Sequence, residues 1–340
     1  MMRCHASIHS LIIVALAILM MVVGNPALAQ QLGPDGAPNP TASAMTEQQL
    51  LQQSPRIEGN IDQPIERARV LIQPAGRVWD YFHQVTLRWI GAIVILGMIA
   101  ALAAAYLVMG RLRISAGRSG KTIPRFNSFE RFAHWLTAVS FVILGLTGLN
   151  ITFGRITLLP MIGPDAFSRM SQIAKYLHNY VSASFVIGLV LIIALWIKDN
   201  VPRKVDVDWI RRGGGFIKSK HAPAGRFNAG EKLVFWFALG AGAVVTVSGV
   251  LLLFPFYVTN IVGMQIAQVV HAVIAVLFVA VIIAHIYIGT LGMEGAFEAM
   301  ATGGVDLNWA KEHHDIWLEE QLTKEPLAAR SGQSSPAAAE

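Results

Sequence analysis

Two histidines interrupt a long apolar stretch, Gln265 to Leu291, that contains no formal charge. The stretch is long enough to cross a bilayer as one helix. His271 and His285 are 14 residues apart, which corresponds to about 21 Å of helix rise and returns to within about 40° of the same helix face. An ionisable side chain inside a membrane span is costly and typically functional. The helix therefore offers two imidazoles on one side, near opposite membrane surfaces.

Imidazole is a neutral axial ligand of haem iron, and such a ligand must lie inside the protein rather than face lipid. One interpretation is that His271 and His285 each bind one of two stacked haems. The alternative is that both are core residues that form hydrogen bonds to neighbouring helices. Partner histidines elsewhere in the chain decide between the two.

The composition is typical of a membrane protein. Of 340 residues, 54% are hydrophobic and only 14% are charged, and the mean hydropathy is +0.51, as in a polytopic membrane protein. The pI of about 9.6 fits basic cytoplasmic loops better than nucleic-acid binding, so no nucleic-acid partner is expected. The single cysteine, Cys4, excludes disulfides, iron–sulfur clusters and covalent Cys-x-x-Cys-His haem attachment within this chain.

The N-terminus has the pattern of a secretory signal peptide over residues 1–29. An apolar core precedes Ala27-Leu28-Ala29, which has the small-x-small form of a cleavage site before Gln30; an uncleaved anchor is the alternative. Residues 30–86 are rich in Pro, Gly and Gln, so we expect an exported, largely disordered segment with a short helix around Thr46–Gln53.

The remaining chain predicts an all-α polytopic membrane protein. Residues 87–110 form one additional N-terminal transmembrane helix, residues 122–291 form a four-helix bundle, and residues 292–340 form a cytoplasmic tail. The four spans are expected at about Phe129–Phe153, Tyr176–Ile197, Leu233–Phe254 and Gln265–Leu291, with residues 154–175 as an exported loop. Residues 198–232 hold nine Lys or Arg against four Asp or Glu, which places this loop in the cytoplasm.

This topology pairs the histidines. His134 begins an outward-going span and His285 ends an inward-going one, so both lie near the cytoplasm. His178 and His271 both begin inward-going spans on the exported side. The four residues thus predict two bis-histidine sites for two non-covalent haems b, with His134 and His285 on the cytoplasmic side and His178 and His271 on the exported side.

A glycine accompanies this pattern. Gly148 lies 14 residues after His134, the same spacing that separates His271 from His285, so it could leave room for a macrocycle at the level of the second haem. Helix packing through Gly145 and Gly148 is the alternative. The other histidines, among them His83, His313 and His314, fall in the signal, at membrane edges or in soluble segments.

The motifs resemble those of the gamma subunit of membrane-bound formate dehydrogenase, a di-haem cytochrome b. The resemblance covers roughly residues 122–320. It is carried by Arg-x-x-His-Trp at 131–135, Leu-His at 177–178, Val201-Pro-Arg-Lys-Val-Asp206 with Trp209, Asn-Ala-Gly at 228–230, His271, His285-Ile-Tyr287, and Trp309-Ala-Lys-x-His-His314 with Trp317.

The resemblance implies an electron carrier that does not itself oxidise formate. A molybdenum or tungsten alpha subunit would oxidise formate, and an iron–sulfur beta subunit would pass electrons to the exported-side haem. The electrons would cross to the cytoplasmic-side haem and reduce a membrane quinone. The implied location is the bacterial inner membrane, with the N-terminal segment exported and the C-terminus cytoplasmic.

The implied quinone site consists of Asn228, Gly230 and His285, with Glu231 where the family has Gln. A carboxyl group could deliver a proton to the reduced quinone, which glutamine cannot do. The alternative is that Glu231 only stabilises a helix N-terminus.

Two other functions remain open. The same type of cytochrome could anchor a hydrogenase or a thiosulfate reductase. A transporter or structural membrane anchor could instead use the histidines as proton relays or hydrogen-bond partners.

Overall fold

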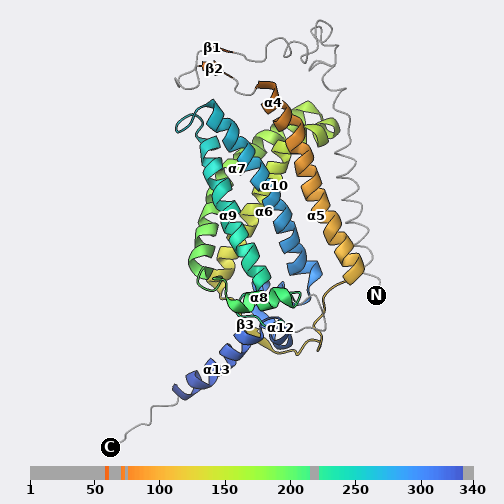
Figure 1. The fold of residues 1–340 in the computed structure, drawn as a ribbon, viewed down its shortest axis with the longest axis vertical. Coiled ribbons are helices and arrows are strands. Elements are labelled where there is room, and N and C mark those ends of the chain that lie inside the picture. Colours follow the sequence, from red (N-terminus) through yellow and green to blue (C-terminus); the bar gives the residue numbers. More distant parts are fainter. Residues whose placement is uncertain (1–57, 61–69, 73–75, 215–221, 332–340) are drawn as a thin grey trace, which may run out of the picture. The chain divides into compact units, whose positions relative to one another are not determined.

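The structure is a computed structural model that describes residues 58–60, 70–72, 76–214 and 222–331. The predicted signal peptide and the predicted helix at Thr46–Gln53 lie outside these residues. Within them the chain is mostly helical (Figure 1). The long helices are α5 (Leu87–Met109), α6 (Ser128–Thr157), α7 (Leu159–Trp196), α9 (Ala229–Leu253) and α10 (Ile261–Tyr287).

Five helical segments among the described residues are long and apolar enough to cross a membrane. They contain α5, α6, α7, α9 and α10. Apolar side chains surround these helices on most sides, as expected where lipid replaces water and the backbone must satisfy its own hydrogen bonds. The predicted fold class, an all-α polytopic membrane protein with one additional N-terminal span, is confirmed. Helix α5 begins at the predicted residue, Leu87, and ends at Met109, one residue before the predicted limit.

The expected exported loop at 154–175 is wrong. α6 continues to Thr157 and α7 begins at Leu159, so this segment is helical. The helical path is interrupted by a turn at Leu158 and again at Gly163, whose φ of +79° is accessible mainly to glycine. Pro164 follows at the start of the next helical stretch, where its missing N–H has no intrahelical partner to lose.

The described residues of the segment before α5 have regular secondary structure. Strand β1 (Glu58–Asn60) pairs antiparallel with β2 (Val70–Ile72). Helix α4 (Gly76–Tyr81) and a π-helical turn, η1 (Phe82–Thr86), lead directly into α5. Helix and strand therefore occur in the described part of this segment, and the other residues that were predicted to be largely disordered lie outside the described residues.

The C-terminal segment is also folded rather than a loose tail. After α10 come a π-helical turn, η2 (Ile288–Gly292), then α11 (Glu298–Ala301), β4 (Gly304–Asp306), α12 (Leu307–His313) and α13 (Asp315–Ser331). Strand β4 pairs antiparallel with β3 (Thr122–Pro124). Burial raises the pKa of Asp306, but hydrogen bonds from Ser119 and from the backbone of Asn308 and Trp309 outweigh this effect and hold the pKa below its ordinary value.

The chain divides into two compact units. Unit 1 comprises residues 1–103, 137–187 and 241–284, and unit 2 comprises residues 104–136, 188–240 and 285–340. Helices α6, α7, α9 and α10 each contribute residues to both units. In unit 1 the rings of Phe141, Phe185 and Phe278 contact one another, with the closest ring centres 4.6 Å apart.

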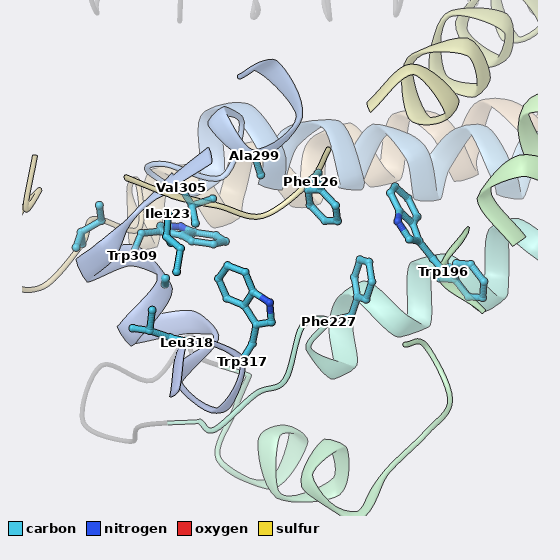
Figure 2. Packing of buried hydrophobic residues seen from close by; sticks show 12 residues of the cluster. Ile123, Phe126, Trp196, Phe227, Ala299, Val305, Trp309, Trp317 and Leu318 are labelled. Carbon is cyan, nitrogen blue, oxygen red and sulfur yellow. The ribbon is translucent and has the colours of Figure 1, made fainter. Parts of the chain in front are cut away.

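Unit 2 is built around a large aromatic cluster (Figure 2). Phe126 packs on Trp196 and Phe227 with ring centres 5.4 and 5.8 Å apart. Trp309 and Trp317, from the C-terminal segment, are almost fully buried in the same cluster. The segment after α10 is therefore an integral part of the core of unit 2.

A short sequence is repeated at the starts of α6 and α9. Arg125-Phe126-Asn127 precedes α6, and Arg226-Phe227-Asn228 precedes α9. In each copy the asparagine side chain accepts a hydrogen bond from the backbone N–H of a glutamate three residues later, and that glutamate carboxylate accepts one from the asparagine N–H. The pairs are Asn127 with Glu130 and Asn228 with Glu231. Both helices thus begin with a capping box.

The two copies exchange their arginines. Arg125 forms an ion pair with Glu231 at 2.9 Å, and Arg226 forms one with Glu130 at 2.6 Å. Arg125 also donates to the backbone carbonyl of Arg226, and Arg226 donates to that of Arg125. These reciprocal contacts hold the N-termini of α6 and α9 together inside unit 2.

Candidate functional site

The predicted pair His178 and His271 is formed in unit 1. His178 lies on α7 and His271 on α10, and their ring centres are 6.2 Å apart with an interplanar angle of 69°. The two imidazoles therefore face each other from different helices, as a bis-histidine site requires.

A buried hydroxyl group binds the Nδ1 atom of each histidine in this pair. Thr147 Oγ1 on α6 lies 2.9 Å from His178 Nδ1, and Ser248 Oγ on α9 lies 3.1 Å from His271 Nδ1. Each hydroxyl also donates to a carbonyl four residues earlier in its own helix, at 2.8 Å to Ile143 and 2.6 Å to Val244. Because a hydroxyl has only one hydrogen, Nδ1–H is assigned as the donor to the hydroxyl oxygen. This tautomer leaves the Nε2 lone pair of each ring free to bind a metal.

Glycines flank both imidazoles. A Cβ atom on Gly249 would lie 3.2 Å from His271 Cε1, closer than ordinary contacts allow, and one on Gly148 would lie 3.5 Å from His178 Cε1. A Cβ atom on Gly145 would instead contact Val279 of α10. Gly148 therefore lies beside the imidazole of His178, whereas Gly145 contributes to helix packing.

The predicted pair His134 and His285 is formed in unit 2, from α6 and α10. Their ring centres are 6.3 Å apart with an interplanar angle of 54°. The first turns of α6 are attached to the C-terminal segment, because Trp135 Nε1 donates to the carbonyl of Met300 and Arg131 donates to that of Thr302. The Nδ1 atom of His134 is buried and has no hydrogen-bond partner among the described residues.

Both pairs fit a haem iron. An iron bound by two imidazoles on opposite faces, with metal–nitrogen bonds of about 2 Å as in other imidazole–metal sites, places the ring centres roughly 6 Å apart. The observed separations of 6.2 and 6.3 Å match this value. Each pair supplies two protein ligands, the number that a haem iron takes from the protein when the porphyrin supplies the other four.

The residues predicted for the quinone site lie in unit 2. Asn228 caps α9, and Gly230 packs against the Trp209 ring of α8 (Lys204–Arg211), where a Cβ atom would lie 3.1 Å from the ring. Glu231 binds Arg125 and is close enough to His285 for an electrostatic interaction. Asn228 and Glu231 are thus joined by hydrogen bonds, and the charge of Glu231 acts on His285.

A cavity of about 330 Å³ also lies in unit 2, but its lining includes none of the four predicted quinone residues. It is lined instead by charged groups that include Arg203, Arg226 and Lys232. Lys232 is already paired with Asp206 at 2.8 Å, and Arg226 with Glu130.

His314, which the sequence places at a membrane edge or in a soluble segment, is buried. It is 0% exposed, its Nδ1 lies 2.8 Å from the carbonyl oxygen of Gly225, and its Nε2 lies 3.8 Å from Glu231 Oε2. Burial, followed by the charge of Arg125, lowers the pKa of His314 to about 3. The ring is therefore neutral at physiological pH, and its Nε2 lies beside Glu231 without a hydrogen-bond partner among the described residues.

Four residues that contact the predicted site residues were not themselves predicted to belong to the site: Thr147, Ser248, Arg125 and His314. Two of them carry a recognisable signal, because Thr147-Gly148 on α6 and Ser248-Gly249 on α9 are a repeated hydroxyl–glycine pair. The repeated Arg-Phe-Asn at 125–127 and 226–228 is a second signal.

Comparisons with known proteins agree with this geometry. The family model described as prokaryotic cytochrome b561 matches residues 125–303, which include all four paired histidines. The chain is 30% identical over 203 residues to the formate dehydrogenase cytochrome b556(fdo) subunit of Escherichia coli strain K12, covering 58% of this chain and 93% of that protein.

Two further relatives are more distant. The nitrate-inducible formate dehydrogenase cytochrome b556(Fdn) subunit of the same strain is 26% identical over 206 residues, covering 59% of this chain and 92% of that protein. The formate dehydrogenase cytochrome b556 subunit of Haemophilus influenzae is 26% identical over 220 residues, covering 63% and 88%. With the family model matched over more than half of its length and across both histidine pairs, the chain belongs to the prokaryotic cytochrome b561 family.

Proposed function

We propose that the chain is the cytochrome b subunit of a respiratory formate dehydrogenase. It accepts electrons from an iron–sulfur subunit, delivers them to a membrane quinone on the cytoplasmic side, and anchors the complex in the bacterial inner membrane. The relatives named as formate dehydrogenase cytochrome subunits support this proposal. The observation that carries it is the presence of two histidine pairs, each with the ring separation of a bis-histidine haem ligand set.

The four histidines hold two non-covalent haems b in this proposal, His178 with His271 and His134 with His285. A bound haem supplies reversible one-electron chemistry at its iron. The protein positions the imidazoles on long, rigid helices, and Thr147 and Ser248 select the tautomer that leaves Nε2 free. Lipid and apolar side chains keep water away from both sites.

The orientation follows from charge. Residues 198–232 and the segment that follows α5 are rich in Lys and Arg, and both lie mostly in unit 2. The positive-inside rule therefore places the His134–His285 pair near the cytoplasm and the His178–His271 pair near the exported side. The iron–sulfur beta subunit and the molybdenum or tungsten alpha subunit of the complex then bind on the exported side.

The quinone binds beside His285 in this proposal, with Asn228, Gly230 and Glu231 forming the rest of the site. Two roles remain for Glu231. Its proximity to His285 and its side-chain exposure of 35% support delivery of a proton from the cytoplasm. Its bonds to Asn228 and Arg125 support a structural role at the start of α9.

The test is the haem content of the purified full-length chain. We expect a dithionite-reduced minus oxidised spectrum with low-spin haem b bands, and two haems per chain by pyridine haemochrome assay. A colourless protein would refute the proposal and leave a transporter or structural anchor.

The partner subunits test the substrate. Co-purification with a molybdenum or tungsten formate dehydrogenase subunit is the expected result. Co-purification with a hydrogenase or thiosulfate reductase subunit would assign the same cytochrome to that complex instead.

A further inference from the structure

The two histidine pairs differ in the hydrogen-bond partners of their Nδ1 atoms. In unit 1 the Nδ1 atoms of His178 and His271 both lie against hydroxyl oxygens, at 2.9 and 3.1 Å. In unit 2 the buried Nδ1 of His134 has no hydrogen-bond partner among the described residues. The asymmetry therefore lies in the outer partners of the ligands, while the ligand type is the same.

Each of the two hydroxyl groups lies against a histidine Nδ1 and against helix carbonyls, and the carbonyls of Leu144 and Val245 also form hydrogen bonds with the rings of His178 and His271. Thr147 is only 7% exposed and Ser248 only 4%, so neither exchanges its partners freely with water. Their own hydrogens are directed to helix carbonyls. The remaining interaction of each oxygen is acceptance of the Nδ1–H bond.

Such a bond alters the metal that the ring binds. Donation from Nδ1–H to an acceptor fixes the ring orientation and raises the basicity of Nε2. A more basic imidazole favours the more highly charged ferric state over the ferrous state and so lowers the reduction potential, one of the levers by which proteins tune haem.

We propose that Thr147 and Ser248 are positioning residues that lower the midpoint potential of the haem iron bound by His178 and His271 below that of the iron bound by His134 and His285. The proposal rests on the haem ligation proposed above. With these potentials an electron moves spontaneously from the His178–His271 site to the His134–His285 site. The repeated hydroxyl–glycine pairs of α6 and α9 would thus set the direction of transfer across the membrane.

One charge in unit 2 acts in the opposite sense. The Glu231 carboxylate interacts electrostatically with His285, and a negative charge also favours ferric iron. Arg125, however, lies 2.9 Å from this carboxylate with a side chain only 3% exposed. Arg125 therefore offsets part of the effect of the Glu231 charge, and the hydroxyl contacts at Nδ1 are the difference between the two sites on which the proposal rests.

The experiment is a spectroelectrochemical redox titration of the full-length, haem-loaded chain. Thr147→Val and Ser248→Ala each remove one hydroxyl with little change in volume. We expect each to weaken the ferric preference about tenfold, the lower end of effects seen for outer partners of metal-bound histidines, which corresponds to an upward shift of about 59 mV for one electron. Loss of one component in His134→Ala identifies which potential belongs to which pair.

The controls isolate the hydroxyl–imidazole bond. Thr147→Ser keeps the hydroxyl and should keep the wild-type potential. Thr152→Val, on the same helix, removes a hydroxyl that binds only the carbonyl of Gly148 and should shift neither component. Three results would overturn the inference but leave the proposed function intact. The first is an equal shift of both haem potentials in Thr147→Val or Ser248→Ala, and the second is a shift of the same size in Thr152→Val. The third is unchanged potentials in Thr147→Val and Ser248→Ala with full haem content. A wild-type chain without haem would refute the proposed function, and the inference with it.

Discussion

The repeated capping boxes allow a sharp test of Glu231, because Glu130 forms a corresponding capping box and arginine ion pair at the start of α6. The perturbation is Glu231→Gln, compared with Glu130→Gln. In both variants the side chain keeps its size and one acceptor oxygen but loses its charge. Glu231 pairs with Arg125, and Glu130 pairs with Arg226 and accepts from Trp196 Nε1 at 2.8 Å.

The expected stability losses follow from these contacts. Breaking a fully buried ion pair costs roughly 3–5 kcal/mol, and hydrogen bonds to charged groups contribute about 1.5–3 kcal/mol. The side chain of Glu231 is 35% exposed and that of Glu130 only 7%. We therefore expect a loss of about 1–2 kcal/mol for Glu231→Gln and about 2–4 kcal/mol for Glu130→Gln, measured as thermal unfolding in detergent.

Quinone reduction separates the two roles of Glu231. Because a corresponding capping box and ion pair recur at Glu130, we expect a structural role, so that both variants keep the rate and the pH profile of quinone reduction once corrected for folded protein. A lower rate or a displaced pH profile in Glu231→Gln alone would refute this reasoning and identify Glu231 as the proton donor. A larger loss of stability in Glu231→Gln than in Glu130→Gln would refute the account of the ion pairs.

Three further predictions follow from single contacts. Gly249→Ala should displace His271, since the new Cβ would lie 3.2 Å from its ring, and should therefore reduce or shift one haem component in the visible spectrum. The control is Gly97→Ala, because a Cβ atom there meets nothing within 4 Å. An unchanged spectrum in Gly249→Ala would contradict the packing argument. His134→Ala should remove one of two haems per chain by pyridine haemochrome assay while His83→Ala retains both, and loss of both haems in His134→Ala would contradict independent sites. In the folded state the pKa of His314 is lowered from 6.5 to about 3, so between these pH values the unfolded chain binds more protons than the folded chain. The contribution of neutral, buried His314 to the free energy of unfolding is therefore complete above pH 6.5. It is lost as the pH falls through this window, by up to about 1.4 kcal/mol per pH unit. His314→Gln should therefore flatten the dependence of the melting temperature on acidic pH, and an unaltered slope would show that His314 is not buried in its neutral form.

The spans and the histidine pairing could be predicted from sequence because they depend on hydropathy and on the alternating direction of successive spans. Neither requires knowledge of the contacts between helices. A long uncharged run in lipid must form a helix, since the backbone has no other hydrogen-bond partners. Alternation of helix direction then assigns His134 and His285 to one side and His178 and His271 to the other, and the structure brings together these same pairs. Helix limits were less certain, as residues 154–175 show, because polar residues can continue a helix beyond the apolar run.

Only the tertiary structure decided which polar groups serve these pairs. Thr147 and His178, or Arg125 and Glu231, meet because two helices adopt a particular rotation and depth, which hydropathy does not report. The C-terminal segment looked like a polar tail, yet Trp309, Trp317 and His314 are buried in unit 2. The sequence by itself determined the spans and predicted the histidine pairs, through the cost of exposing backbone and imidazole to lipid. Packing between distant segments determined the tautomers, the ion pairs and the surroundings of Glu231, because those depend on contacts that form only when the helices are assembled.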